Sequence, residues 1–298
     1  MVYLFTGEND FAVREALKEL ERSLGISAEH HSGAELTMAQ LPDLLMGVSL
    51  FTVQRLVVLD RLSENTSLWQ KLPYWVSRIA NDSTVVFVEP KPDKRTTAYK
   101  ALKANATVRE FPLWTERDTS LAKQWVIERA KAHQLPIDTR TAAHLVERVG
   151  VDQWRLSSAL DTLSLLDAIT ITIIDEVIPA TLSENVFQLF EVALKGDKDR
   201  VAQMIATLSL QDDPSALFAL LSSQVQTLAA IIFKADGDDP VKDFAIHPFV
   251  ASKLTQQAKR FTKADSAHML TLFAKADADL KRSRGEPWVV VEKLLLSL

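Results

Sequence analysis

The stretch Gly47-Val48-Ser49-Leu50-Phe51-Thr52-Val53-Gln54-Arg55-Leu56-Val57-Val58-Leu59-Asp60 divides into two parts that predict different things. Its second part is an apolar, largely β-branched run that ends at Asp60, which is typical of a buried strand in a parallel sheet. Its first part places Leu50 and Phe51 just ahead of that strand, at the end of an expected helix. Large apolar side chains at such a junction either belong to the core or bind a partner, and burial statistics alone favour the core.

Short apolar runs alternate with amphipathic helices on both sides of this stretch. Residues 2–5, 84–88 and 107–111 are apolar runs that predict three more strands. Apolar residues recur at helical spacing over residues 11–24 and 68–79, and again just before Gly47. Strands that alternate with helices predict a parallel, doubly wound sheet. We therefore expect an α/β domain with an ATPase-like three-layer fold over residues 1–112.

The turn after the first expected strand, Thr6-Gly7-Glu8-Asn9-Asp10, stands where a nucleotide-binding fold has its phosphate loop. A phosphate loop needs several glycines and a Lys-Ser/Thr pair, so that backbone N–H groups can wrap the phosphates. This turn has one glycine, then acidic residues, and no lysine. It predicts a degenerate phosphate loop that binds no ATP, although an ordinary βα turn would have the same local sequence. Asp60 ends its strand where an ATPase would hold a metal, and we interpret it instead as a helix cap or loop residue.

Beyond Pro112 the helical periodicity continues almost without a strand pattern. Residues 113–180 contain a compact set of short helices, and residues 181–298 contain a longer series of apolar helices. We therefore expect two all-α domains with these bounds after the α/β domain. At 298 residues the chain is long enough for three domains, each with its own core.

Composition excludes several kinds of protein. The chain has no cysteine, which excludes disulfides, thiolate zinc sites and cysteine nucleophiles, and which fits a cytoplasmic location. We expect no signal peptide and no membrane association, because the N-terminus lacks a basic region and no apolar run reaches membrane-spanning length. The net charge of −5 argues against a protein that coats nucleic acid, but it is compatible with a local basic face.

The order of these parts resembles the DNA polymerase III delta subunit, the bacterial clamp-loader delta family. The resemblance covers nearly the whole chain, and five stretches carry it in the family's order. These are Tyr3-Leu4-Phe5-Thr6-Gly7-Glu8-Asn9-Asp10-Phe11; Ser49-Leu50-Phe51 with Arg55 and the strand after it; Val88-Glu89-Pro90 with Asp93-Lys94-Arg95 and Tyr99-Lys100-Ala101-Leu102-Lys103; Asn185-Val186-Phe187-Gln188-Leu189 before Gly196-Asp197; and Asp279-Leu280-Lys281. The degenerate phosphate loop agrees with a family that keeps the ATPase fold without binding ATP.

The resemblance implies a role for each domain. Ser49, Leu50 and Phe51 would contact the sliding clamp (beta), with the two apolar side chains in its peptide-binding pocket, and would open the ring for loading onto primer-template DNA during replication. Residues 113–180 would form a lid, and residues 181–298 a collar that packs against the other clamp-loader subunits, delta-prime and gamma/tau. The chain alone would be no enzyme, with no catalytic residue, cofactor or metal, although it would belong to a DNA-directed DNA polymerase holoenzyme.

Other candidate residues have weaker support. Lys91, Lys94 and Arg95 could face DNA, but a solvated surface is the simpler interpretation. His30 and His31 have no nearby set of metal ligands, and we interpret them as part of a solvated loop. Two other functions stay open: an active AAA+-type NTPase of the same fold, which nucleotide binding would reveal, and a helical DNA-binding or scaffold adaptor, which would not bind a clamp.

Overall fold

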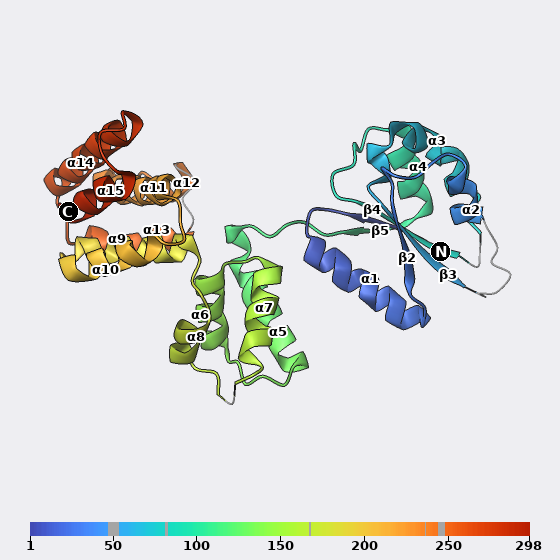
Figure 1. Ribbon diagram of the computed structural model, residues 1–298, viewed down its shortest axis with the longest axis horizontal. Coiled ribbons are helices and arrows are strands. Elements are labelled where there is room, and N and C mark those ends of the chain that lie inside the picture. Colours follow the sequence, from blue (N-terminus) through green and yellow to red (C-terminus); the bar gives the residue numbers. More distant parts are fainter. Residues whose placement is uncertain (47–53, 81–82, 167, 236, 244–247) are drawn as a thin grey trace. The chain divides into compact units, whose positions relative to one another are not determined.

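The computed structural model describes residues 1–46, 54–80, 83–166, 168–235, 237–243 and 248–298. The chain divides into two compact units, Met1–Thr115 and Glu116–Leu298. The strands lie in the first unit, and the described residues of the second unit are helical (Figure 1).

The first unit alternates strands and helices. Its elements in chain order are β1 (Val2–Thr6), α1 (Asp10–Leu24), β2 (Ala28–Ser32), α2 (Gln40–Met46), β3 (Arg55–Asp60), the 3-10 turn η1 (Leu62–Glu64), α3 (Thr66–Val76), β4 (Ser83–Glu89), α4 (Thr97–Asn105) and β5 (Thr107–Glu110). Among the described residues the five strands form one sheet in the order β2-β3-β4-β1-β5. Every neighbouring pair is parallel, which confirms the predicted α/β fold class.

Helices cover both faces of this sheet, because successive side chains on a strand point to opposite sides. Leu4, Val57 and Phe87 pack in one core cluster with buried residues of α2, α3 and α4. Their sequence neighbours Phe5 and Val58 pack in a second cluster with α1. Figure 1 shows α1 on one side of the sheet and α3 and α4 on the other, so the predicted three layers are confirmed.

Strand β2 corrects one prediction. Its residues, Ala28–Ser32, include His30 and His31, which the sequence placed in a loop. β2 pairs with β3 alone and so lies at the edge of the sheet. Its side chains are half-buried or exposed, so it has no apolar run to mark it as a strand.

The second unit is built from short and long helices. They are η2 (Glu116–Asp118, 3-10), α5 (Thr119–Ala132), α6 (Thr139–Val149), α7 (Gln153–Leu163), α8 (Ile171–Val177), α9 (Leu182–Leu194), α10 (Lys198–Leu208), α11 (Pro214–Phe233), α12 (Pro240–Asp243), α13 (Pro248–Ala258), α14 (Lys263–Lys281) and α15 (Pro287–Leu295). The largest core cluster takes its buried residues only from the span between Val186 and Leu295. The boundary near residue 180 stays a prediction.

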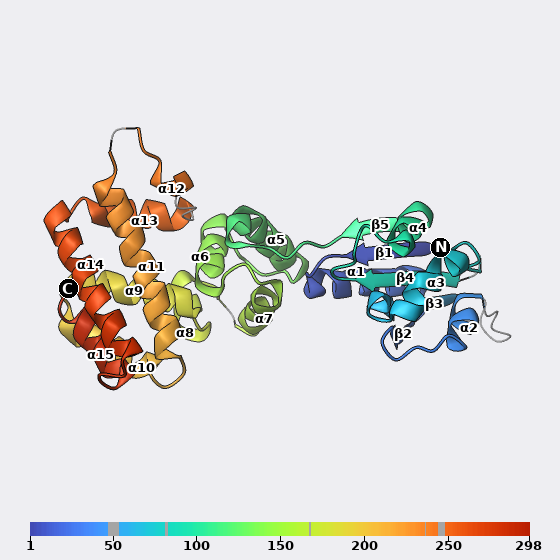
Figure 2. The same ribbon diagram turned by 90° about the horizontal axis from the view of Figure 1, so that it is seen from above.

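Helix α11 is more apolar than the sequence pattern suggested. Its 20 residues have a mean hydropathy of 1.8, so by length and composition this helix alone, among the described residues, could cross a membrane. Leu217, Leu221 and Leu228 are fully buried in the core cluster. Figure 2 shows α11 running among α9, α13, α14 and α15. These features identify the core helix of a globular unit, because one face of α11 is already covered by its neighbours.

Candidate functional site

The predicted clamp-contacting residues Ser49, Leu50 and Phe51 lie outside the described residues. The structure does describe the two elements that flank them, since α2 ends at Met46 and β3 begins at Arg55. Leu41 and Leu45 of α2 are fully buried and pack in the same cluster as residues of β3. The chain therefore enters and leaves this segment from elements that are anchored in the core, at the amino edge of the parallel sheet.

Arg55, the first residue of β3, links three elements at that edge. Its Nε and Nη2 atoms donate to Glu29 Oε1 and Oε2 of β2, at 2.9 and 2.6 Å. Its Nη1 atom donates to the backbone carbonyl of Asp43 in α2, at 3.3 Å. The hydrogen bond from Arg55 lowers the pKa of the Glu29 carboxyl group, so the carboxylate is the form that the contact favours.

The β1–α1 turn lies at the opposite, carboxyl edge, where a phosphate loop would be. Gly7 has a φ of +111°, and a Cβ on it would lie 2.0 Å from the Phe111 carbonyl oxygen. The backbone of the chain after β5 thus presses directly against this turn. Only glycine fits here, both because of the positive φ and because of the close approach.

The chain itself occupies the N–H groups of this turn. The N–H of Gly7 donates to the Pro90 carbonyl at 3.2 Å, and the N–H of Asn9 donates to the Phe111 carbonyl at 3.1 Å. The Asn9 side chain caps α1 by accepting from the Ala12 N–H at 3.1 Å. Phosphate binding at a helix N-terminus needs such N–H groups to point at the ligand. Here they bond to protein oxygens, so the turn offers no phosphate cradle of the usual kind.

A hollow of about 370 Å³ remains beside this turn, and its lining includes two of the predicted DNA-facing lysines. Lys91 Nζ lies 2.7 Å from Glu8 Oε1, and Lys94 Nζ lies 3.7 Å from Glu110 Oε1. Arg95, the third predicted residue, pairs with Asp93 at 3.0 Å, and its guanidinium holds the pKa of Asp93 down at about 2. Each of the three cations therefore has an acidic neighbour. The structure does not gather them into a purely basic patch, and contact with DNA stays a prediction.

Two carboxyl groups end the central strands at this edge. Asp60 is the last residue of β3, not a helix cap or loop residue as the sequence suggested, and partial burial raises its pKa. Glu89, the last residue of β4, is fully buried. The N–H and Oγ of Ser63 lie 3.0 and 2.5 Å from its two carboxyl oxygens. Burial raises the pKa of Glu89 to about 7, although the bonds from Ser63 oppose the rise. Among the described residues no group of three His, Asp or Glu side chains could hold a metal ion.

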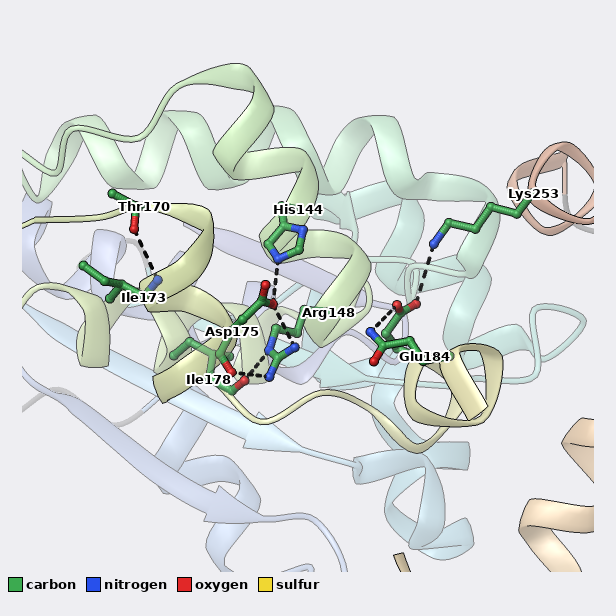
Figure 3. Close-up of polar contacts among 9 residues, drawn as sticks. His144, Arg148, Thr170, Ile173, Asp175, Ile178, Glu184 and Lys253 are labelled. Atoms are coloured by element: carbon green, nitrogen blue, oxygen red, sulfur yellow. Dashed lines mark hydrogen bonds and ion pairs between the residues drawn. The ribbon is translucent and has the colours of Figure 1, made fainter. Parts of the chain in front are cut away.

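A polar cluster in the second unit was not predicted from the sequence (Figure 3). On α6, Arg148 donates to the carboxylate of Asp175 at 2.9 Å, to its backbone carbonyl at 2.7 Å, and to the carbonyl of Ile178. His144, one turn earlier, lies 2.8 Å from the same carboxylate. The Arg148 carbonyl also accepts from the N–H of Thr181, the N-cap of α9. The cluster fixes α8 and the start of α9 against α6. Its sequence signal was the spacing of His144 and Arg148 on one helical face.

A second polar contact in Figure 3 ties α9 to α13. Lys253 Nζ lies 3.9 Å from Glu184 Oε2 and 4.7 Å from the centroid of the Phe187 ring. Both side chains of the ion pair are largely buried, so the contact belongs to the internal packing of the second unit.

Comparisons with known proteins place both ends of the chain. The family model described as DNA polymerase III, delta subunit, matches residues 3–111, and the model for the C-terminal domain of the DNA polymerase III delta subunit matches residues 183–298. DNA polymerase III subunit delta of Bacillus subtilis is 24% identical over 253 residues, which cover 80% of this chain and 70% of that protein.

Solved structures with a similar fold agree in part with these matches. The Bacillus subtilis DNA clamp loader delta protein aligns with a TM-score of 0.59 at 19% identity, over 99% of this chain and 94% of that chain. The RuvB Holliday junction branch migration motor of Thermotoga maritima aligns with a TM-score of 0.40 at 12% identity, over 86% of this chain and 78% of that chain. The first supports a common fold, while the second is too distant to support an inference.

Proposed function

Since the chain belongs to the DNA polymerase III delta subunit family, we propose that it binds the sliding clamp through Leu50 and Phe51 and opens the ring for loading. The observation that carries this proposal is that family matches at both ends of the chain occur together with an ATPase-like fold whose phosphate-binding turn is closed by Phe111 and Pro90. A subunit of this kind would act through binding alone.

The physical basis of ring opening is differential binding. Burial of Leu50 and Phe51 in an apolar pocket is worth about 1.5–3 kcal/mol for each side chain. A ligand shifts a conformational equilibrium only by the difference in its affinity for the two states. If the pocket or its surroundings fit these side chains better in the open ring, part of this binding energy favours opening, with no chemical step in this chain.

The other domains would supply assembly. Residues 113–180 would form the lid and residues 181–298 the collar, which packs against delta-prime and gamma/tau. The apolar character of α9–α15 supports a structural role for the collar, and the absence of cysteine is compatible with a cytoplasmic location. ATP hydrolysis would belong to neighbouring subunits, and primer-template DNA would be met as part of the complex.

Two other functions make different predictions. An active NTPase of this fold would bind Mg-ATP, but the N–H groups of the β1–α1 turn bond to the chain's own carbonyls, and Glu8 and Asp10 would repel phosphate. A helical scaffold or DNA-binding adaptor would not recognise a clamp. The ion pairs of Lys91, Lys94 and Arg95 give the adaptor no particular support.

The test is a pair of titrations with the purified full chain. Titration with the sliding clamp of the same organism should give saturable binding, and calorimetric titration with Mg-ATP should be flat. A micromolar dissociation constant for Mg-ATP would favour the NTPase. No binding to the clamp at micromolar concentrations, with the chain folded, would favour the adaptor.

A further inference from the structure

Arg55 joins the two described ends of the stretch that contains Leu50 and Phe51. It is the first residue of β3, and its guanidinium donates to the carbonyl of Asp43, twelve residues earlier in α2. Asp43 lies in the last turn of α2, where backbone carbonyls have no partner within the helix. The bond therefore gives a helix-end carbonyl a donor, and it fixes the end of α2 to the start of β3.

The same guanidinium is held rigidly from the other side. Glu29 of β2 accepts two hydrogen bonds from it, and only 17% of the Arg55 side chain is exposed. A planar fork with donors in several directions can satisfy a carboxylate and a carbonyl at once, whereas a lysine ammonium is a single point charge on a flexible stem. The depressed pKa of Glu29 is consistent with a close, charge-assisted pair.

We propose that Arg55 is a positioning residue for clamp binding, which fixes both ends of the segment that presents Leu50 and Phe51. This inference rests on the proposed function and extends it to a residue that need not touch the clamp. A segment whose ends are fixed loses less conformational freedom when it binds, and that saving appears directly as affinity. Loss of the Arg55 contacts should therefore weaken binding even when the fold survives.

The competing explanation is that Arg55 only stabilises the sheet. A cross-strand pair with Glu29 would account for that role, and its loss would lower the melting temperature without changing the affinity of folded molecules. The contact with Asp43 is the feature that this explanation leaves unused, because it reaches out of the sheet to the helix before the segment. Affinity measured on folded protein therefore separates the two roles.

The experiment compares clamp affinity among variants of the full chain, at a temperature where circular dichroism shows each of them folded. Arg55→Gln removes the fork. Arg61→Gln is the matched control, because Arg61 follows the other end of β3 and pairs with Glu64 at 3.8 Å. Arg55→Lys keeps the charge but loses the fork, and it replaces Arg55→Gln if that variant does not fold. Leu50→Ala/Phe51→Ala tests the proposed function itself.

The proposal predicts that Arg55→Gln weakens clamp binding about tenfold, while Arg61→Gln stays within about twofold of the parent. Arg55→Lys should fall between them. If the Leu50/Phe51 variant loses binding while the folded Arg55 variants bind like the parent, Arg55 has only a structural role and the inference is wrong. If the Leu50/Phe51 variant binds like the parent, the proposed function fails and the inference fails with it.

Discussion

Glu89 gives the first unit a stability that depends on pH near neutrality. Its carboxyl group is fully buried at the end of β4, and its pKa in the folded chain is about 7, compared with an ordinary value of 4.5. The folded state therefore holds this proton more tightly than the unfolded state. Between these two values the folded state binds more protons, so the free energy of unfolding falls as pH rises.

The size of the effect follows from the shift. A rise from 4.5 to about 7 corresponds to about 3 kcal/mol, which is fully present below the unfolded pKa and lost as pH rises through the folded pKa. Glu89→Gln is neutral at every pH, and its amide can still accept from the N–H of Ser63. The stability of the parent relative to this variant should therefore fall by about 3 kcal/mol between pH 4 and pH 8.

The assay is urea unfolding at several pH values, followed by hydrogen exchange of β4 so that it reports on the first unit. Ser63→Ala supplies a second test, because the Ser63 hydroxyl bond lowers the pKa of Glu89. Its removal should move the loss of stability to higher pH. A constant difference between the parent and Glu89→Gln across this range would refute the claim that Glu89 is protonated in the folded chain near neutrality.

Three other predictions test the turn, the polar cluster and the domain roles. Gly7→Ala should destabilise the first unit by about 2 kcal/mol or more in urea unfolding, because a Cβ would lie 2.0 Å from the Phe111 oxygen; unchanged stability would contradict the geometry of the turn. Arg148→Met should destabilise the second unit by about 2 kcal/mol, since it leaves the carbonyls of Asp175 and Ile178 without this donor; hydrogen exchange of α8 measures the loss, and unaltered protection would count against it. A fragment of residues 1–180 should bind clamp but not join the loader, and its normal co-purification with the other subunits would contradict the collar role of residues 181–298.

The central strands were predictable because their burial is written in their composition. Residues 56–59 and 85–88 are continuous apolar runs, and both faces of these strands are covered by helices. The edge strand β2 was not predictable in this way, because Ala28–Ser32 has no apolar run and the strand is defined by its pairing with β3. Local pattern identifies elements that bury both faces, and it misses elements whose identity depends on a neighbour.

The candidate site shows the same limit. The missing lysine and the single glycine of the β1–α1 turn were readable from the sequence, but its closure depends on Phe111, more than a hundred residues away. The contacts of Arg55 with Glu29 and Asp43 likewise join residues from separate elements. Such contacts follow from the order of strands in the sheet, which a single sequence does not specify.

Leu50 and Phe51 carry the proposed function most directly, and one measurement tests them. Leu50→Ala/Phe51→Ala is compared with the parent in the full chain by a thermal melt and by titration with the sliding clamp. If the two side chains serve the clamp, stability should change by less than about 0.5 kcal/mol, as is usual at exposed positions. Clamp affinity should fall by about 3 kcal/mol or more, which is over about a hundredfold. A collapsed melting temperature with unchanged clamp binding by the folded fraction would show that they belong to the core, and would contradict the proposed function.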